Sequence, residues 1–214
     1  MLRDRIASLM MVVGLAGAMM PAAYGQKWEV GAGGGASFYN SQTIDGATSV
    51  SAKFKPGYGF TGYLGQIGNR LGGEIRYTFL SNEMELSGGG KSFTMGGRSQ
   101  AIHYDLNVYF ADKESKVRPY VLVGGGVKQF SGTGSAGAIQ PLMSTAVLTN
   151  TSEWKPIATA GGGVRVAMGP HTNIRAEVRA YVSQAPTKVI TPVTGSLGGW
   201  YFDIVPMVSL SYVW

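Results

Sequence analysis

The chain contains no cysteine among its 214 residues, and charged residues make up only 14% of it. The absence of cysteine excludes disulfide bonds and thiolate metal sites. Beyond residue 25 no apolar run reaches 18 residues, which excludes a protein that crosses a membrane with helices. The net charge is +6, but lysine and arginine are scattered singly rather than clustered. That pattern argues against a nucleic-acid partner.

Glycine and aromatic residues are abundant in the chain. The chain has 33 glycines and 11 tyrosines. Many of them lie in segments in which apolar and polar side chains alternate, and alternation with a period of two is typical of β-strands. The length suits one domain with a sizeable core. The composition therefore indicates an all-β protein.

The N-terminal residues read as an export signal. Arg3 and Arg5 give a positive start, and an uncharged apolar run follows over residues 9–20. This run has the length of a signal-peptide core and is too short to span a membrane as a helix. We expect residues 1–25 to be a signal peptide and residues 26–214 to be the folded domain, with an N-terminal membrane anchor as the alternative.

The remaining sequence predicts eight strands of 11 residues or more. A tilted strand needs about 9 to 11 residues to cross the hydrocarbon layer of a membrane, whereas strands of soluble proteins are usually about half that length. The predicted strands are Lys27–Tyr39, Ala52–Gly65, Leu71–Ser81, Arg98–Ala111, Pro119–Phe130, Pro156–Met168, Asn173–Ser183 and Trp200–Trp214.

The connections between these strands alternate in length. Short ones are predicted at residues 66–70, 112–118 and 169–171, and long, polar, glycine-rich ones at 40–51, 82–97, 131–155 and 184–199. This alternation is typical of an up-and-down barrel whose two ends face different compartments. The predicted fold is an eight-stranded antiparallel up-and-down transmembrane β-barrel.

Each predicted strand has one apolar and one charged face. In the seventh strand, Ile174 and Val178 share a face, and Arg175, Glu177 and Arg179 share the other. The apolar faces carry aromatic residues near the strand ends, as the interfacial girdles of transmembrane barrels do. We therefore expect the apolar faces to contact lipid. The alternative is a soluble lipid-binding barrel of the lipocalin kind, with the charges in solvent.

The charged faces would then line the lumen. They carry five acidic and five basic residues, so complete pairing is attainable, and pairing is what makes buried charge tolerable. In an eight-stranded barrel side chains fill the interior, so we expect a plugged lumen. The predicted lumen charge network is Glu29, Glu74, Arg76, Asp105, Lys128, Arg165, Arg175, Glu177, Arg179 and Asp203.

Glycine and proline mark special positions inside the strands. Triplets at Gly33–Gly35, Gly124–Gly126 and Gly161–Gly163 are expected to make room for bulky side chains of neighbouring strands. No triplet is followed by Lys-Ser or Lys-Thr at phosphate-loop spacing. Pro206 costs the eighth strand a ladder hydrogen bond, which predicts a bulge there or a later start of the strand.

The last residues alternate and end on an aromatic ring, at Val208, Leu210, Tyr212 and Trp214. They resemble the C-terminal signal that the bacterial barrel-assembly machinery reads. Together with the stretch Arg118–Lys128, the whole domain resembles the small outer-membrane β-barrels of the OmpA/OmpX-like superfamily. The resemblance implies a place in the cell outer membrane, with outer-membrane lipid, lipopolysaccharide and the assembly machinery as partners.

The sequence offers no catalytic constellation. The lipid A deacylases of this size use His and Ser two residues apart, whereas Asp105 follows His103 and Asn173 follows His171 at that spacing. We expect no catalytic residue, no cofactor and no metal site. The leading hypothesis is a structural or surface-interaction role, with a surface ligand bound by four long extracellular loops. Alternatives are a narrow pore and an enzyme acting on lipid A. Basic loop residues that could contact lipopolysaccharide are Lys53, Lys55, Lys91, Arg98, Lys155 and Lys188.

Overall fold

The computed structural model describes residues 27–44, 50–134, 139–197 and 199–214. The expected signal peptide lies outside these ranges and stays a prediction. No helix in the described ranges has the length and apolarity to cross a membrane. The strands are β1 Lys27–Tyr39, β2 Gln42–Ile44, β3 Val50–Phe54, β4 Gly57–Ile67, β5 Leu71–Gly88, β6 Lys91–Tyr109, β7 Val117–Gly132, β8 Ala146–Leu148, β9 Ser152–Ala167, β10 Thr172–Gln184, β11 Ile190–Pro192 and β12 Trp200–Val213.

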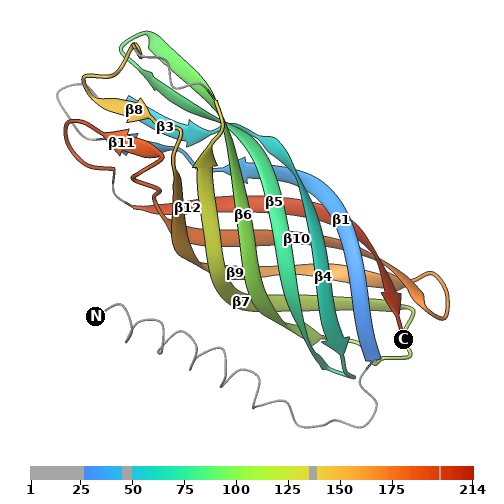
Figure 1. Cartoon of the computed structure of the whole chain (residues 1–214). Helices are drawn as coiled ribbons and strands as arrows, with labels where there is room; N and C mark the ends of the chain where they lie inside the picture. The colour runs from blue at the N-terminus through green and yellow to red at the C-terminus, as the bar shows by residue number, and fades with distance from the viewer. Residues whose placement is uncertain (1–26, 45–49, 135–138, 198) are drawn as a thin grey trace.

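Eight strands form a closed antiparallel ring. The order around it is β1, β4, β5, β6, β7, β9, β10 and β12, and β12 pairs back to β1 with Val213 opposite Glu29. Figure 1 shows these strands wrapped around a common axis. Ring closure leaves no open sheet edge along the barrel wall. The predicted eight-stranded up-and-down barrel is confirmed.

The barrel strands are long, from 11 residues in β4 to 19 in β6. Three short connections at residues 68–70, 110–116 and 168–171 lie at one end, which we call the short-turn end. The other end, the long-loop end, carries β2, β3, β8 and β11 (Figure 1). The predicted sorting of short and long connections is therefore confirmed in outline.

One of the four predicted long loops is not a loop. Residues 82–97 continue β5 and β6 as a paired hairpin, in which Gly88 lies opposite Lys91. The turn consists of Gly89 and Gly90, with φ of 56° and 74°. Two consecutive residues at positive φ define the tight turn that suits the twist of a hairpin, and glycine adopts it without strain. The loop prediction for residues 82–97 is wrong because the glycines there form a two-residue turn.

The predicted second strand is split by a bulge. Residues 55–57, which join the end of β3 to the first residue of β4, lie opposite only two residues of β5, Asn82 and Glu83. Pro56 has no N–H to donate to the ladder. The Asn82 Nδ2 donates instead to the Lys55 carbonyl over 2.8 Å. The side chain thus replaces a backbone bond where the register shifts.

Pro206 causes no bulge, and β12 starts where it was predicted to start. The register between β1 and β12 is the same on both sides of the proline, with Gly35 opposite Met207 and Phe38 opposite Ile204. Only the pairing of the residues between these two pairs is missing on this side of β12. On the other side the ladder with β10 continues, with Pro206 opposite Val178. The expectation of a bulge is wrong, because the N–H that Pro206 lacks interrupts pairing only on the side of β12 that faces β1.

The two faces of each strand have opposite environments. In β10, Arg175 and Arg179 are completely buried, while Val178 between them is 51% exposed. Apolar side chains point outward around the whole ring, and aromatic rings gather near both ends of the strands. The exposed aromatic residues are Trp28, Phe38, Tyr58, Phe60, Tyr77, Phe110, Trp154, Trp200, Phe202, Tyr212 and Trp214. The predicted orientation, with apolar faces outward and charges inward, is confirmed.

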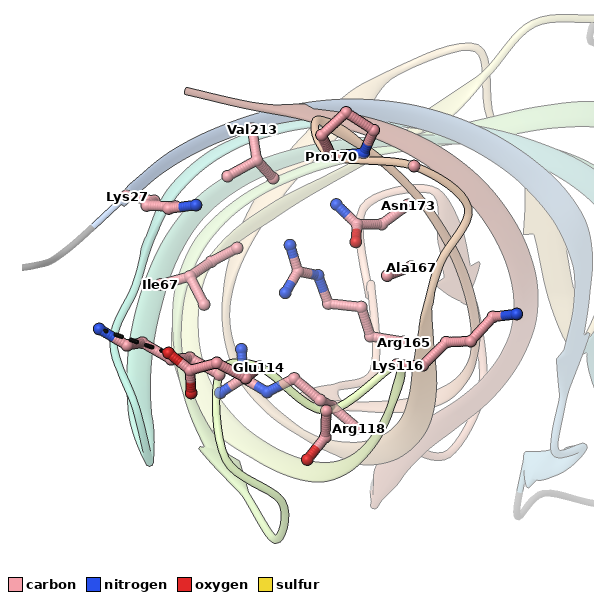
Figure 2. Close-up of a pocket in the computed structure, with 13 residues that line it drawn as sticks. Lys27, Ile67, Glu114, Lys116, Arg118, Arg165, Ala167, Pro170, Asn173 and Val213 are labelled. Carbon is pink, nitrogen blue, oxygen red and sulfur yellow. Dashed lines mark ion pairs between the residues drawn. The ribbon is translucent and has the colours of Figure 1, made fainter.

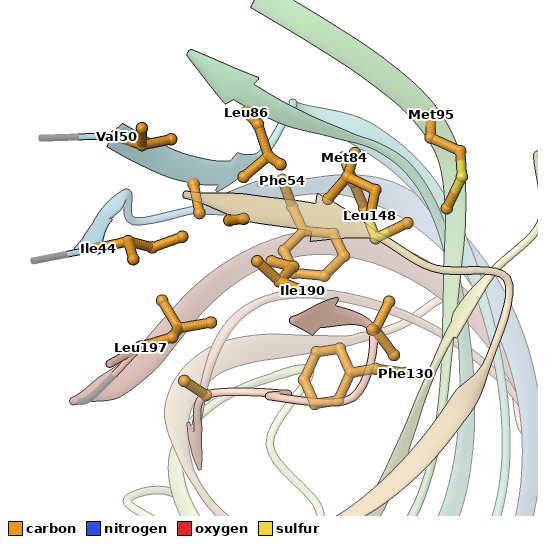
Figure 3. Close-up of a cluster of buried hydrophobic side chains, with 14 of the residues drawn as sticks. Ile44, Val50, Phe54, Met84, Leu86, Met95, Phe130, Leu148, Ile190 and Leu197 are labelled. Carbon is orange, nitrogen blue, oxygen red and sulfur yellow. The ribbon is translucent and has the colours of Figure 1, made fainter. Parts of the chain in front are cut away.

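The long-loop end has an apolar core of its own, shown in Figure 3. Strands β2 and β3 extend the β5–β6 hairpin as a sheet, while β8 and β11 pair with each other. Phe54 packs against Phe130 and Tyr201, with ring centroids 5.8 Å apart in both pairs. We call this unit the apolar cap. Its buried residues are Ile44, Val50, Ala52, Phe54, Met84, Leu86, Met95, Phe130, Leu142, Ala146, Leu148, Ala185, Val189, Ile190, Leu197 and Tyr201.

Inward-facing glycines lie where a side chain would meet a neighbouring strand. A Cβ on Gly126 would overlap the Ile102 carbonyl and the backbone of His103, and one on Gly163 would lie 2.8 Å from the Glu177 Cβ. Carbon atoms do not approach so closely without displacement. These two triplets therefore make room for neighbouring strands that bear bulky charged side chains, as predicted.

Candidate functional site: the charged barrel interior

The ten charged residues predicted for the lumen all lie inside the barrel. Each is at most 7% exposed, and Asp105, Arg175 and Arg179 are 0% exposed. They come from seven of the eight ring strands, so residues distant in sequence meet on the barrel axis. Burial of charge costs several kcal/mol per ion unless partners compensate it. The arrangement of partners therefore decides whether the barrel is stable.

Glu74 of β5 is the centre of the network. Its carboxylate accepts hydrogen bonds from Arg76 over 2.7 Å, from Arg175 over 2.8 Å and from Arg179 over 2.6 Å. Asn107 donates a fourth, over 3.2 Å. Three guanidinium groups on one carboxylate would leave positive charge in excess. Further acids must therefore lie close by.

Glu177 of β10 supplies the second carboxylate. It lies 2.9 Å from Arg76 and 3.2 Å from Arg175, and it accepts a hydrogen bond from Arg179 Nε over 3.0 Å. The Tyr120 hydroxyl donates to it over 2.5 Å. Glu74 and Glu177 thus share the same three arginines, which forms a connected cluster rather than separate pairs.

Asp105 of β6 completes this cluster. It forms an ion pair with Arg179 and accepts a hydrogen bond from Thr159 Oγ1 over 2.5 Å. His103 lies beside it, with Nδ1 3.0 Å from the carboxylate. The central cluster therefore holds three arginines and three carboxylates, so its formal charge is balanced when His103 is neutral.

Two smaller pairs lie on either side of the central cluster. Lys128 donates to Asp203 over 2.6 Å and to the Tyr39 hydroxyl over 3.0 Å, towards the long-loop end. Glu29 lies towards the short-turn end, 3.3 Å from Arg165 and 3.6 Å from Arg175. Paired charges thus occupy much of the length of the barrel interior.

Aromatic rings line the arginines. The Arg76 guanidinium lies 4.3 Å from the ring centroid of Tyr63, and Arg175 lies 4.6 Å from the same centroid. Cation–π contacts of this kind are worth about 2 kcal/mol when both groups are desolvated. The rings also fill volume around the guanidinium groups.

Arg118 is a buried charge that the sequence interpretation missed. It is 2% exposed, and its Nη2 donates to the carbonyls of Gly68 and Asn69 over 3.0 and 2.6 Å. It therefore fastens β7 to the β4–β5 turn. The sequence contained the signal, since Arg118 and Tyr120 are two residues apart and share the inward face. The predicted strand, however, began at Pro119, two residues after the start of β7.

The two histidines lie in different parts of the barrel. His103 lies between Asp105 and the Tyr181 hydroxyl, 3.3 Å from its Nε2, but it is only 2% exposed. Substrate could not reach it without opening the barrel. His171 lies in the β9–β10 turn, where its Nδ1 is 2.8 Å from the Val213 carbonyl. This contact fastens the end of β12 to the β9–β10 turn.

Three of the six loop residues considered for lipopolysaccharide contact are paired with carboxylates of this chain. Lys53 lies 3.6 Å from Glu85, Lys55 3.3 Å from Glu83, and Lys155 2.7 Å from Glu153. The hydrogen bond to Glu83 raises the pKa of the Lys55 ammonium group. Their charge is thus partly neutralised locally.

The C-terminal residues Val208, Leu210 and Tyr212 share the outward face of β12, Trp214 follows directly after this strand, and all four are at least half exposed. With the closed ring and the charged interior, this outward apolar surface defines a class: a β-barrel that crosses a membrane. The profile of the family described as "Outer membrane protein beta-barrel domain" matches residues 9–189. The chain belongs to this family, and it is a protein of the bacterial outer membrane.

The comparison with solved structures includes one match that supports the same fold. The chain is similar to Neisserial surface protein A (NspA), with 15% identity, a TM-score of 0.55, and coverage of 88% of this chain and 98% of that one. It is also similar to Ail, the attachment invasion locus protein of Yersinia pestis, with 15% identity, a TM-score of 0.49, and coverage of 88% and 99%. No curated protein sequence matches the chain. The likeness to NspA shows a shared fold.

Proposed function

We propose that this chain is a closed, non-enzymatic outer-membrane barrel that presents the apolar cap and its loops at the cell surface as an interaction site. The observation that carries this proposal is the interior. Ten charged side chains from seven strands fill the lumen and pair with one another. Such a filled interior supports a scaffold rather than a channel.

The orientation follows from the two ends. Long connections of outer-membrane barrels lie outside and short turns lie in the periplasm, so the apolar cap would face the exterior. On this cap Ile139 is 83% exposed, Val193 56% and Met143 47%. Exposed apolar side chains close together in space favour contact with another molecule. The hydrogen bond from Val193 N to the Thr145 carbonyl places the segment of Val193 beside that of Met143.

Lipopolysaccharide would be held by the loop cations that the chain does not neutralise itself. Within the described ranges, neither Lys91 nor Arg98 has a carboxylate at ion-pair distance, and both are exposed. The outward residues at the C-terminus, Val208, Leu210, Tyr212 and Trp214, would be read by the barrel-assembly machinery during insertion. Both roles rest on the position of these residues and on the resemblance of the C-terminal strand to an assembly signal.

The closed lumen is tested by conductance. We expect the full chain, reconstituted in planar bilayers, to produce no single-channel steps, because paired charged side chains occupy the lumen. Parallel samples should first show the faster gel migration of unheated, folded protein. Regular voltage-independent steps from such folded protein would contradict the closed scaffold and favour a narrow pore.

The surface role is tested on cells that display the chain. Replacement of Ile139, Met143 and Val193 by serine should lower cell aggregation and adhesion to host-cell monolayers several-fold, since less apolar surface is offered. The matched control is Thr94→Ser, an exposed position of the β5–β6 hairpin. Equal adhesion by all three strains, at equal surface levels, would contradict this role.

A further inference from the structure

The short-turn end contains a cavity that the closed-scaffold proposal does not use. It has a volume of about 350 Å³ and lies at the mouth of the barrel (Figure 2). It is lined by five basic residues and one acidic residue: Lys27, Lys113, Lys116, Arg118, Arg165 and Glu114. Lys113 lies 3.8 Å from Glu114, so the single acid is already engaged.

Arg165 is the innermost cation of this cavity. Its side chain is 8% exposed, and Figure 2 shows it directed into the centre of the opening. The Nε atom is buried and lies 3.3 Å from Glu29 Oε1, but the two are not aligned as a hydrogen bond, so Nε has no hydrogen-bond partner among the residues that the structure describes. Its one counter-charge in those residues is Glu29, 3.3 Å away. An arginine so deeply placed normally has its donors satisfied.

Glu29 cannot neutralise Arg165 alone. The same carboxylate lies 3.6 Å from Arg175 and also accepts a hydrogen bond from Ser211. In the strand ladders Arg165 is directly opposite Arg118 on one side and Arg175 on the other. Like charges directly opposite each other on neighbouring strands are destabilising. The central cluster is balanced, whereas this end of the lumen has an excess of positive charge.

Arg118 is held in place as part of the rim. Two of its hydrogen bonds go to the carbonyls of Gly68 and Asn69, and its guanidinium stacks 4.1 Å from the ring centroid of Tyr109. Lys113 and Lys116 are exposed and line the same cavity. The cavity is thus surrounded by the deep guanidinium of Arg165, the fixed guanidinium of Arg118 and the ammonium groups of two lysines. Together these groups can hold one anion through several hydrogen bonds.

We propose that this cavity is a binding site for a phosphate group. A phosphate offers more acceptor oxygens and more charge than a carboxylate, and guanidinium groups match its geometry. The group could belong to an anionic phospholipid of the leaflet at the short-turn end or to free inorganic phosphate. In both cases its oxygens would complete the hydrogen bonding of Arg165 and relieve the repulsion among Arg118, Arg165 and Arg175.

The test uses the refolded full-length barrel in a phosphate-free maltoside detergent, titrated with inorganic phosphate. We expect saturable shifts of the amide resonances of residues 113–118 and of the Arg165 Nε–H, with acetate at least tenfold weaker. Arg165→Gln should weaken binding about tenfold or more, the range for loss of a charge-assisted hydrogen bond. The matched control Arg98→Gln, at the opposite end, should bind as the wild type does.

A second variant covers the case in which Arg165→Gln does not fold. Lys113 and Lys116 are exposed, so the double glutamine variant should fold and should weaken phosphate binding about two- to fivefold. Shifts that never saturate, equal affinity for acetate, or unchanged binding in the lysine variant would overturn the proposal. These results are independent of conductance and adhesion, so the closed scaffold can fail while this site stands.

Nanodiscs distinguish the two sources of the phosphate. If the headgroup is the ligand, discs of phosphatidylglycerol should already show the shifted resonances without added phosphate, and discs of phosphatidylcholine should not. If free phosphate is the ligand, both discs should respond to it alike. Absence of a response in either disc, with or without phosphate, would overturn the proposal.

Discussion

Arg179→Leu is expected to lower the free energy of unfolding of the barrel by about 3 to 5 kcal/mol, the usual cost of removing one partner from a buried ion cluster. Arg179 contacts Glu74, Glu177 and Asp105, and it is 0% exposed. Its loss leaves three carboxylates with two arginines. Urea unfolding of the protein in lipid vesicles, followed by tryptophan fluorescence, measures the change.

The control for this prediction is Arg98→Leu. Arg98 lies on β6 of the same barrel, but it is exposed near the long-loop end. Its loss should therefore change the unfolding free energy by at most about 0.5 kcal/mol. Asp105→Asn in the Arg179→Leu background should recover part of the stability, because it removes one orphaned charge. An unfolding midpoint unchanged by Arg179→Leu would show that this arginine does not face inward.

Gly126→Ala is expected to destabilise the barrel by about 3 kcal/mol, the upper end for overpacking a close-packed interior. The added methyl group would overlap the Ile102 carbonyl and the backbone of His103. Neither can move without breaking the β6–β7 ladder. The free energy of unfolding, measured as for Arg179→Leu, gives the comparison.

Gly62→Ala is the matched control, since among the described residues beyond its chain neighbours a Cβ there would approach only the Gly31 carbonyl oxygen, 3.9 Å away. This substitution should be neutral or slightly stabilising, because alanine restricts the unfolded chain. Equal destabilisation by both alanines would mean that glycine matters for backbone freedom rather than for close approach of strands.

The barrel could be predicted from sequence because its signal is local. Alternation in a segment such as residues 173–183 assigns Arg175 and Arg179 to one face whatever the rest of the chain does. The exclusion of long apolar runs and the sorted connections then restrict the fold to a transmembrane barrel. The face of each interior charge follows from the same rule.

The apolar cap could not be predicted in this way, because its core is assembled from distant segments. Ile44 and Leu148 lie in strands of three residues, which are too short for an alternating pattern, and they pack with Phe54 and Phe130 from the barrel strands and their extensions only in the folded chain. The partners of each interior charge could likewise not be predicted from the sequence. Which acids surround Arg179 depends on strand register and on how far each side chain extends across the lumen.

The orientation of the strand faces is tested most directly on β10 with single-cysteine spin labels, which the absence of native cysteine makes simple. In lipid vesicles, labels at residues 174, 176, 178, 180 and 182 should collide readily with dissolved oxygen and hardly with a water-soluble nickel complex. Labels at 175, 177, 179 and 181 should be shielded from both reagents or disrupt insertion. Nickel access at 174–182 without alternation, or the opposite alternation, would contradict a barrel with lipid outside and paired charge within.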